Sequence, residues 1–153
     1  VIGILATKGT LSSKLFHKTS ELYSRDIKIV EVVGQGLVRL IERGEHNTFE
    51  MEILLRQLLK PMLEAHIDYL VLGCSHYPYL IPMLKKIFPP DVTIIDSGEA
   101  VARQPKKVLE ENHLQNEGDK VPAHKLFSNV DPKVLGLLTN AALNNYEVSY
   151  LEF

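Results

Sequence analysis

The stretch YLVLGCSHYPYLIPML, residues 69–84, carries the pattern that decides the fold of this chain. An apolar run ends at Gly73, polar residues follow it, and Pro78 stands where a helix would begin. A short apolar run that is bounded by such signals predicts a buried strand, and proline is favoured in the first turn of a helix. The stretch therefore predicts a strand over 67–73 that passes through a short polar turn into a helix.

The same alternation of strand and helix extends in both directions along the chain. Apolar or alternating runs predict further strands over 1–6, 27–33, 92–96, 124–128 and 146–153. Amphipathic segments predict helices over 11–24, 37–43, 48–65, 97–112 and 131–143, with loops over 7–10 and 113–123. Such alternation indicates an α/β fold in which helices flank a mostly parallel sheet.

The helix expected over 48–65 has the most detailed local signals. Thr48 or Asn47 is the predicted N-cap, because a short polar side chain there can accept a bond from the first turn. Pro61 is predicted to kink or split the helix, since proline lacks an amide hydrogen. The apolar face of this helix is expected to consist of Ile53, Leu54, Leu58, Leu59 and Met62.

Composition is typical of a globular protein. The 153 residues suffice for about one domain, and 45% hydrophobic and 24% charged residues are ordinary fractions. A net charge of −2 gives no bulk attraction to nucleic acid or to an anionic membrane. No apolar run approaches the roughly 18 residues of a membrane span, and no signal peptide is evident. The single cysteine excludes an internal disulfide and is typical of a reducing compartment, so we expect a cytoplasmic protein.

Two polar segments follow predicted strands, residues 7–10 and residues 74–76. Ligands of open parallel sheets bind beyond the carboxyl ends of the strands, so we expect both segments near a ligand site. The thiolate is the reactive form of a cysteine, and both His76 and the N-terminus of the following helix would favour it at Cys74. Such a thiol can serve as a nucleophile or as a proton-transfer base.

A second interpretation of these residues stays open. Cysteine is among the most frequently buried residue types, so Cys74 can equally be a small buried residue, with His76 as a turn residue. One cysteine and scattered histidines show no metal-ligand spacing, so no metal site is expected.

The segment VLGCSHYPYLIPML resembles the motif around the second catalytic cysteine of glutamate racemases, GCTHYP followed by a hydrophobic pair. Further segments resemble that family in the same order, along nearly all of the chain: IGILATKGTLSS, GLVRLIERG, VTIIDSGEAVARQ and HKLFSNVDP. Related aspartate and hydantoin racemases share the cysteine but typically lack the His-Tyr-Pro that follows it. The resemblance is therefore to glutamate racemases in particular.

The resemblance implies an enzyme without a cofactor that interconverts L- and D-glutamate by means of two cysteines on opposite faces of the α-carbon. Such an enzyme supplies D-glutamate for the peptidoglycan of the cell wall. Cys74 matches the cysteine that acts on the L-glutamate face, and His76 matches the residue that assists it beside the substrate. Ser75 replaces the usual threonine and keeps a hydroxyl for a contact with the substrate.

Three other residues match the family at positions near the substrate. Thr7 and Thr10 match hydroxyl residues near the substrate carboxylate, and Glu42 matches an acid near the catalytic histidine. The alternatives stay open that Thr7 and Thr10 are only turn and cap residues, and that Glu42 lies on a solvated helix face. Apart from glutamate, the expected partner is a second copy of the chain, in a homodimer.

The chain departs from the family in one large respect. The family's first lobe begins with an Asp-Ser-Gly segment and supplies the other cysteine, whereas this chain has no second cysteine. IDSGEAV at 95–101 matches a later Asp-Ser-Gly of the family instead. We therefore expect the carboxyl-terminal part of a racemase, with residues 1–96 as its second lobe and residues 97–153 as a segment that belongs with the first lobe. Such a chain is expected to be inactive alone.

Other functions also stay open. The chain can be a racemase-like lobe that binds a ligand without catalysis, or another amino-acid racemase of the superfamily. A cysteine hydrolase that uses Cys74 and His76 is the least favoured, because a pair two residues apart on one turn rarely reaches nucleophile–base geometry and no oxyanion loop is evident.

Overall fold

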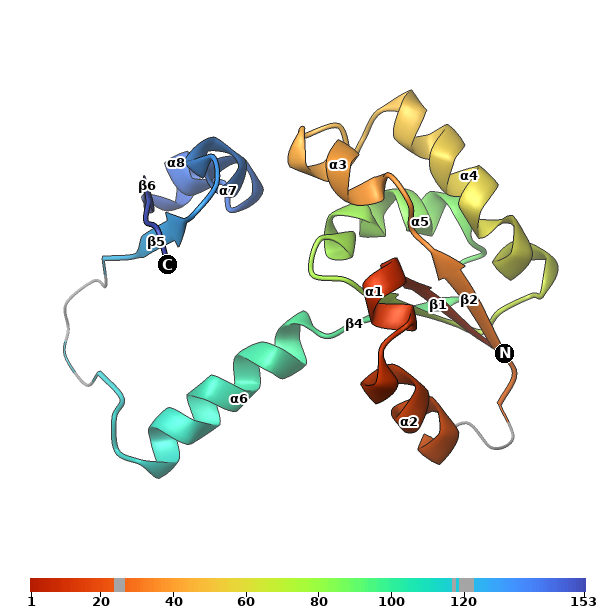
Figure 1. Ribbon diagram of the computed structural model, residues 1–153, viewed down its shortest axis with the longest axis horizontal. Helices are drawn as coiled ribbons and strands as arrows, with labels where there is room; N and C mark the ends of the chain where they lie inside the picture. The colour runs from red at the N-terminus through yellow and green to blue at the C-terminus, as the bar shows by residue number, and fades with distance from the viewer. Residues whose placement is uncertain (24–26, 117, 119–122) are drawn as a thin grey trace.

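The computed structural model describes residues 1–23, 27–116, 118 and 123–153. Residue 24 of the helix expected over 11–24, and part of the loop expected over 113–123, lie outside these ranges. Each strand expected from the sequence is present (Figure 1). The strands are β1 (Ile2–Ala6), β2 (Ile29–Val33), β3 (Tyr69–Gly73), β4 (Thr93–Asp96), β5 (Lys125–Ser128) and β6 (Glu147–Tyr150). The helices are α1 (Lys8–Leu11), α2 (Lys14–Tyr23), α3 (Leu37–Glu42), α4 (Phe49–Glu64), the 3₁₀ helix η1 (Tyr77–Leu80), α5 (Ile81–Ile87), α6 (Gly98–Glu111), α7 (Pro132–Leu138) and α8 (Ala141–Asn144).

A parallel four-stranded sheet with the order β2-β1-β3-β4 organises the first part of the chain. The prediction of an α/β fold with a parallel sheet is confirmed. From β1 the chain crosses to β2 on one side, and it later returns to β3 on the other side of β1. The boundary between β1 and β3 is therefore the point at which the strand order reverses, where ligands of open sheets bind.

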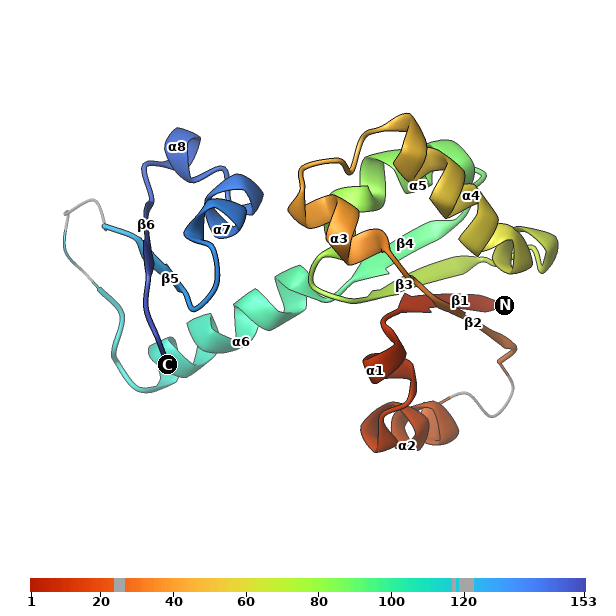
Figure 2. The ribbon, with the colours of Figure 1, turned by 45° about the horizontal axis from the view of Figure 1, so that its top comes forward.

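The two faces of this sheet are covered unequally. Helices α3, α4 and α5 lie over one face, and α1 and α2 lie on the other side (Figure 2). The main core lies between the sheet and the first group: Leu5, Val32, Leu37, Leu40, Ile41, Met51, Leu55, Leu59, Met62, Ile67, Leu70, Leu72, Tyr77, Leu80, Met83, Leu84, Ile87 and Phe88. By contrast, α2 contributes no buried residue.

Helix α4 differs in part from its prediction. Thr48 is the N-cap, since its hydroxyl oxygen accepts a bond of 3.2 Å from the Met51 amide. Pro61 does not split the helix, which runs unbroken to Glu64. The predicted apolar face is partly wrong, because Ile53 is 42% exposed. The buried residues of α4 are Met51, Leu55, Leu59 and Met62. Because α4 has apolar residues on more than one side, the packing of the helix against the sheet determines which of them are buried.

Three further segments also differ from their predictions. Residues 8–10, expected as part of a loop, belong to the one-turn helix α1, which the Thr7 side chain caps. The helix expected to begin at Pro78 starts with the 3₁₀ turn η1 before α5. The helix expected over 131–143 is two helices, α7 and α8, because Asn140 adopts a left-handed conformation with φ of 49°.

The last part of the chain departs from the sheet along α6, which extends away from it in both views (Figures 1 and 2). Strands β5 and β6 form their own parallel two-stranded sheet, against which α7 packs, and α8 packs against α7. Helix α7 begins at Pro132 with Asp131 as its cap, whose carboxylate accepts a bond of 2.9 Å from the Lys133 amide. Helix α7 also contacts α3, so the two sheets are linked by packing as well as by the chain.

Candidate active site

The turns after β1 and β3 lie side by side at the carboxyl edge of the sheet. The Thr10 hydroxyl donates a bond of 3.3 Å to the carbonyl oxygen of Gly73, the residue before Cys74. The Thr10 amide donates to the Thr7 hydroxyl oxygen at 3.3 Å, and the two hydroxyl oxygens are 3.0 Å apart. Both threonines therefore serve as cap and turn residues, and they also hold the first turn against the second.

Cys74 is a free cysteine at the end of β3, and it is half-buried against the core. The Tyr77 amide donates a bond of 3.1 Å to the Cys74 carbonyl, which closes the turn into η1. Ser75, between Cys74 and His76, is exposed. The turn thus presents a partly accessible thiol and a hydroxyl at the point where the strand order reverses.

His76 and Glu42 form a pair between two elements that are far apart in the sequence. The distance from His76 Nε2 to Glu42 Oε1 is 3.1 Å, and the side chains are 26% and 44% exposed. When Nε2 donates its proton to this carboxylate, Nδ1 is the nitrogen that can accept one. Glu42 is therefore not merely a residue of a solvated helix face. Within the described ranges, no hydrogen bond joins the Cys74 thiol to His76, and such bonds are often long before a substrate binds.

Tyr77 is a residue of this site that the sequence analysis did not single out. Its side chain is fully buried, and its hydroxyl donates a bond of 3.2 Å to the Gly34 carbonyl at the end of β2. Burial, and to a smaller degree the negative charge of a Cys74 thiolate, raise the pKa of Tyr77 to about 12. The neutral hydroxyl ties the turn after β2 to the turn that carries Cys74. Gly34 leaves room for the ring, since a Cβ atom there would lie 2.8 Å from Tyr77 Cζ, but it is 43 residues away in the sequence, so no local signal pointed to Tyr77.

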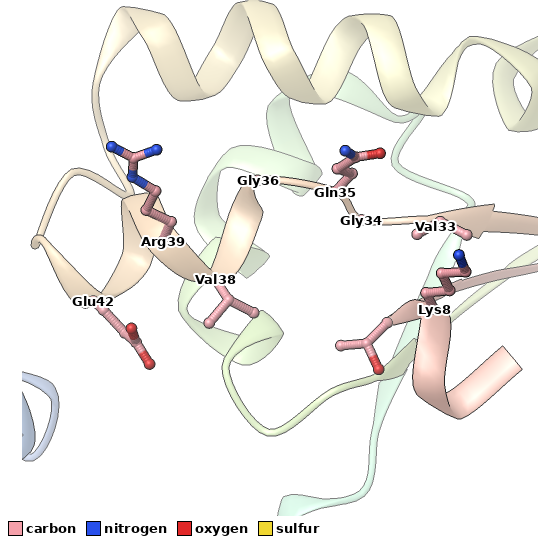
Figure 3. A pocket seen from close by; sticks show the side chains of 9 residues that line it. Lys8, Val33, Gly34, Gln35, Gly36, Val38, Arg39 and Glu42 are labelled. Atoms are coloured by element: carbon pink, nitrogen blue, oxygen red, sulfur yellow. The ribbon is translucent and has the colours of Figure 1, made fainter. Parts of the chain in front are cut away.

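A cavity of about 580 Å³ opens at the carboxyl ends of β1 and β2 (Figure 3). Its lining consists of Thr7, Lys8, Val33, Gly34, Gln35, Gly36, Val38, Arg39 and Glu42. Glu42 and Arg39 leave α3 in opposite directions (Figure 3). The cavity lining includes two of the predicted site residues, Thr7 and Glu42, but not Cys74.

In the part of the chain that the structure describes, no group of three or more His, Cys, Asp or Glu side chains is placed to hold a metal ion. No helix in the same ranges has the length and apolar character needed to cross a membrane.

The sequence model of the Asp/Glu/Hydantoin racemase family matches residues 1–104. The chain is 42% identical over 135 residues to the glutamate racemase of Pseudomonas putida (strain W619), covering 88% of this chain and 51% of that protein. It is 36% identical over 133 residues to the glutamate racemase of Stutzerimonas stutzeri (strain A1501), covering 87% of this chain and 50% of that protein. The chain thus spans about half the length of these relatives.

Solved structures show the same partial coverage. Glutamate racemase isoform RacE1 from Bacillus anthracis matches 99% of this chain with a TM-score of 0.78 and 26% identity, over 56% of its own length. The Escherichia coli glutamate racemase, solved in complex with L-glutamate and the activator UDP-MurNAc-ala, matches 99% of this chain with a TM-score of 0.75 and 27% identity, again over 56% of its own length.

Proposed function

The chain belongs to the Asp/Glu/Hydantoin racemase family, and on that premise we propose that it forms the second lobe and carboxyl-terminal segment of a glutamate racemase. The observation that carries this proposal is the half-buried Cys74 thiol at the end of β3, one turn from the His76–Glu42 pair. The glutamate racemases to which the chain is 42% and 36% identical support glutamate as the substrate. The interconversion of L- and D-glutamate would supply D-glutamate for peptidoglycan, in the cytoplasm.

Racemisation requires a base on one face of the α-carbon and an acid on the other. In the L-to-D direction, the Cys74 thiolate takes the α-proton, and the electron pair of the C–H bond stays on the α-carbon. A thiol of the first lobe then donates a proton to the opposite face. The two sulfur atoms thereby exchange protonation states, and the reverse direction uses the same groups with their roles exchanged.

The other residues of the site would support this proton transfer. Glu42 holds the His76 imidazole through Nε2, which leaves Nδ1 as the nitrogen that would accept the proton of the thiol. The hydroxyl groups of Thr7, Thr10 and Ser75 would contact the substrate, with the two threonines near its carboxylate. No step of this scheme needs a metal or an organic cofactor.

The chain alone supplies only half of this machinery. It has one cysteine, so no second thiol can protonate the opposite face. The α-proton of an amino acid is also very weakly acidic, and its removal needs a closed site in which fixed donors replace water. We therefore propose that the isolated chain does not racemise glutamate.

The test is to restore the missing half. The part of the Pseudomonas putida racemase that this chain does not match is fused to the chain, and the optical activity of L- or D-glutamate is followed by circular dichroism. We expect turnover by the fusion and none by the chain alone. Cys74→Ser in the fusion should lower kcat by about 10²- to 10⁴-fold, the range for a lost general base, whereas Thr93→Ser at the opposite edge of the sheet should not.

The outcomes separate the alternatives. Robust turnover by the isolated chain would overturn the two-lobe proposal, and normal turnover by Cys74→Ser would overturn the role of the thiol. Turnover of aspartate but not glutamate would indicate another amino-acid racemase of the family. A well-folded fusion that binds glutamate without turnover would indicate a ligand-binding lobe.

A further inference from the structure

Helix α7 lies against the two elements that carry the His76–Glu42 pair. Glu42 ends α3, and α7 contacts α3 directly. Leu137 of α7 packs against Gly44, just beyond α3, since a Cβ atom at Gly44 would lie 3.1 Å from Leu137 Cδ2. The next residue, Leu138, packs against the main core. The carboxyl-terminal segment is therefore anchored beside Glu42.

Tyr79 connects α7 to the turn that carries His76. Its amide donates a bond of 3.3 Å to the His76 carbonyl, and its hydroxyl donates a bond of 2.5 Å to the Leu138 carbonyl. The Tyr79 ring is half-buried, and its centroid lies 6.0 Å from that of His46. One side chain thus spans from the His76 turn to α7.

We propose that Tyr79 is a positioning residue, whose bond to the Leu138 carbonyl makes α7 a brace that holds His76 against Glu42. This inference rests on the proposed function. The His76 turn is a single 3₁₀ turn, whose internal hydrogen bonds have poorer geometry than those of an α-helix. Glu42 stands at a helix end, which is a position where helices fray. A brace that touches both elements therefore limits the distance between the paired side chains.

The first measurement is the rate at which iodoacetamide alkylates Cys74, which is the only thiol of the chain. Tyr79→Phe removes the hydroxyl and keeps the ring. We expect the rate to fall about threefold, within the range for the loss of one hydrogen bond, because a displaced imidazole is less well placed to accept the proton that the thiol loses on alkylation. Glu42→Gln should also lower the rate. The matched control is Tyr23→Phe on α2, where the side chain is 77% exposed, and it should leave the rate unchanged.

A double-mutant cycle distinguishes positioning from simple packing. If Tyr79 acts through the His76–Glu42 pair, Tyr79→Phe should have little further effect on alkylation in the Glu42→Gln background. Fully additive losses would overturn the proposal, as would an unchanged rate in Tyr79→Phe alone.

A spectroscopic measurement reports on His76 itself. The measurement is the ¹⁵N chemical shift of His76 Nε2 in the labelled chain. The Tyr79→Phe variant should show a shift that has moved from the parent value toward the value of the Glu42→Gln variant. The Tyr23→Phe variant should show the parent value. A resonance that Tyr79→Phe leaves in place would also overturn the brace. Neither measurement needs glutamate or the first lobe, so the brace proposal can be overturned while the racemase proposal stands. Conversely, an inactive fusion in which Tyr79 and Glu42 still show their coupling in alkylation would count against the racemase proposal only.

Discussion

The region that contains the four-stranded sheet and the region that follows it use the same alternation of strands and helices, yet they differ sharply in burial. Among the residues that the structure describes, all of the buried hydrophobic ones but Ala141 lie in residues 5–88. Helix α6 contributes none, although it is amphipathic. Large apolar side chains remain exposed after residue 96: Val101, Val108, Leu109, Leu114, Phe127, Val130, Leu137, Leu143, Tyr150, Leu151 and Phe153.

This difference shows that amphipathic helices and strands form a buried core only where the sheet is wide enough to cover their apolar faces. In the first region, α3, α4 and α5 share one face of four strands. In the second region, two strands offer too little apolar surface for independent stability. The exposed apolar side chains are consistent with the proposal that this segment belongs with another lobe.

The largest effect is expected for a buried leucine of the first region, and an exposed leucine of the second region provides the comparison. Leu84 of α5 is fully buried, so Leu84→Ala should lower the free energy of unfolding by about 2–5 kcal/mol. Leu143 of α8 is 88% exposed, so Leu143→Ala should change it by less than about 0.5 kcal/mol. Urea denaturation followed by far-ultraviolet circular dichroism measures both. Equal losses would show that the carboxyl-terminal region has a core of its own.

The next effect concerns Tyr77 and alkaline pH. Because burial raises the pKa of Tyr77 from 10.0 to about 12, the folded state holds the hydroxyl proton more tightly than the unfolded state does. The resulting stability is complete below pH 10 and is lost as the pH rises toward 12. The shift corresponds to about 2–3 kcal/mol. We expect unfolding in urea to become easier over this pH range in the parent protein.

Tyr77→Phe provides the comparison. This substitution should lower the free energy of unfolding by about 1 kcal/mol at neutral pH, because the hydrogen bond to Gly34 is lost. It should also reduce the loss of stability between pH 10 and pH 12. Tyr146→Phe, outside the first region, should leave the decline as it is. Parallel pH profiles for the parent and Tyr77→Phe would contradict the assignment.

The smallest expected effect is at Gly136, and Gly34 provides the comparison. Gly136 lies inside α7 with no atom within 4 Å of an added Cβ, so Gly136→Ala should stabilise α7 by about 0.5–1 kcal/mol. Amide hydrogen exchange within α7 measures this gain. Gly34→Ala should instead destabilise the first region by about 1–3 kcal/mol, because the Cβ would meet the Tyr77 hydroxyl and lie 2.8 Å from Leu37 Cδ1. A gain at Gly34 would mean that Tyr77 is not held where the structure has it.

Local signals in the sequence were sufficient for several features. The strand–helix alternation, a cap at Thr48 or Asn47 and the end of α3 before Gly44, with its φ of 76°, each depend on residues within a few positions of one another. The apolar stripe of α4 could not be predicted in the same way, because that helix has apolar residues on several sides. Only the position of the sheet determines which of them are buried.

The sequence by itself determined the fold class, and it identified Cys74 and His76 as neighbours on one turn, since both properties follow from residues close together in the chain. The tertiary structure decided which distant residues complete the site. Glu42, which the family resemblance placed near the histidine, forms a hydrogen bond with His76, while Tyr77 contacts Gly34 and Tyr79 contacts Leu138. Each contact depends on the order of the strands and on the path of each crossover. Those features arise from the packing of whole elements, which no local pattern specifies.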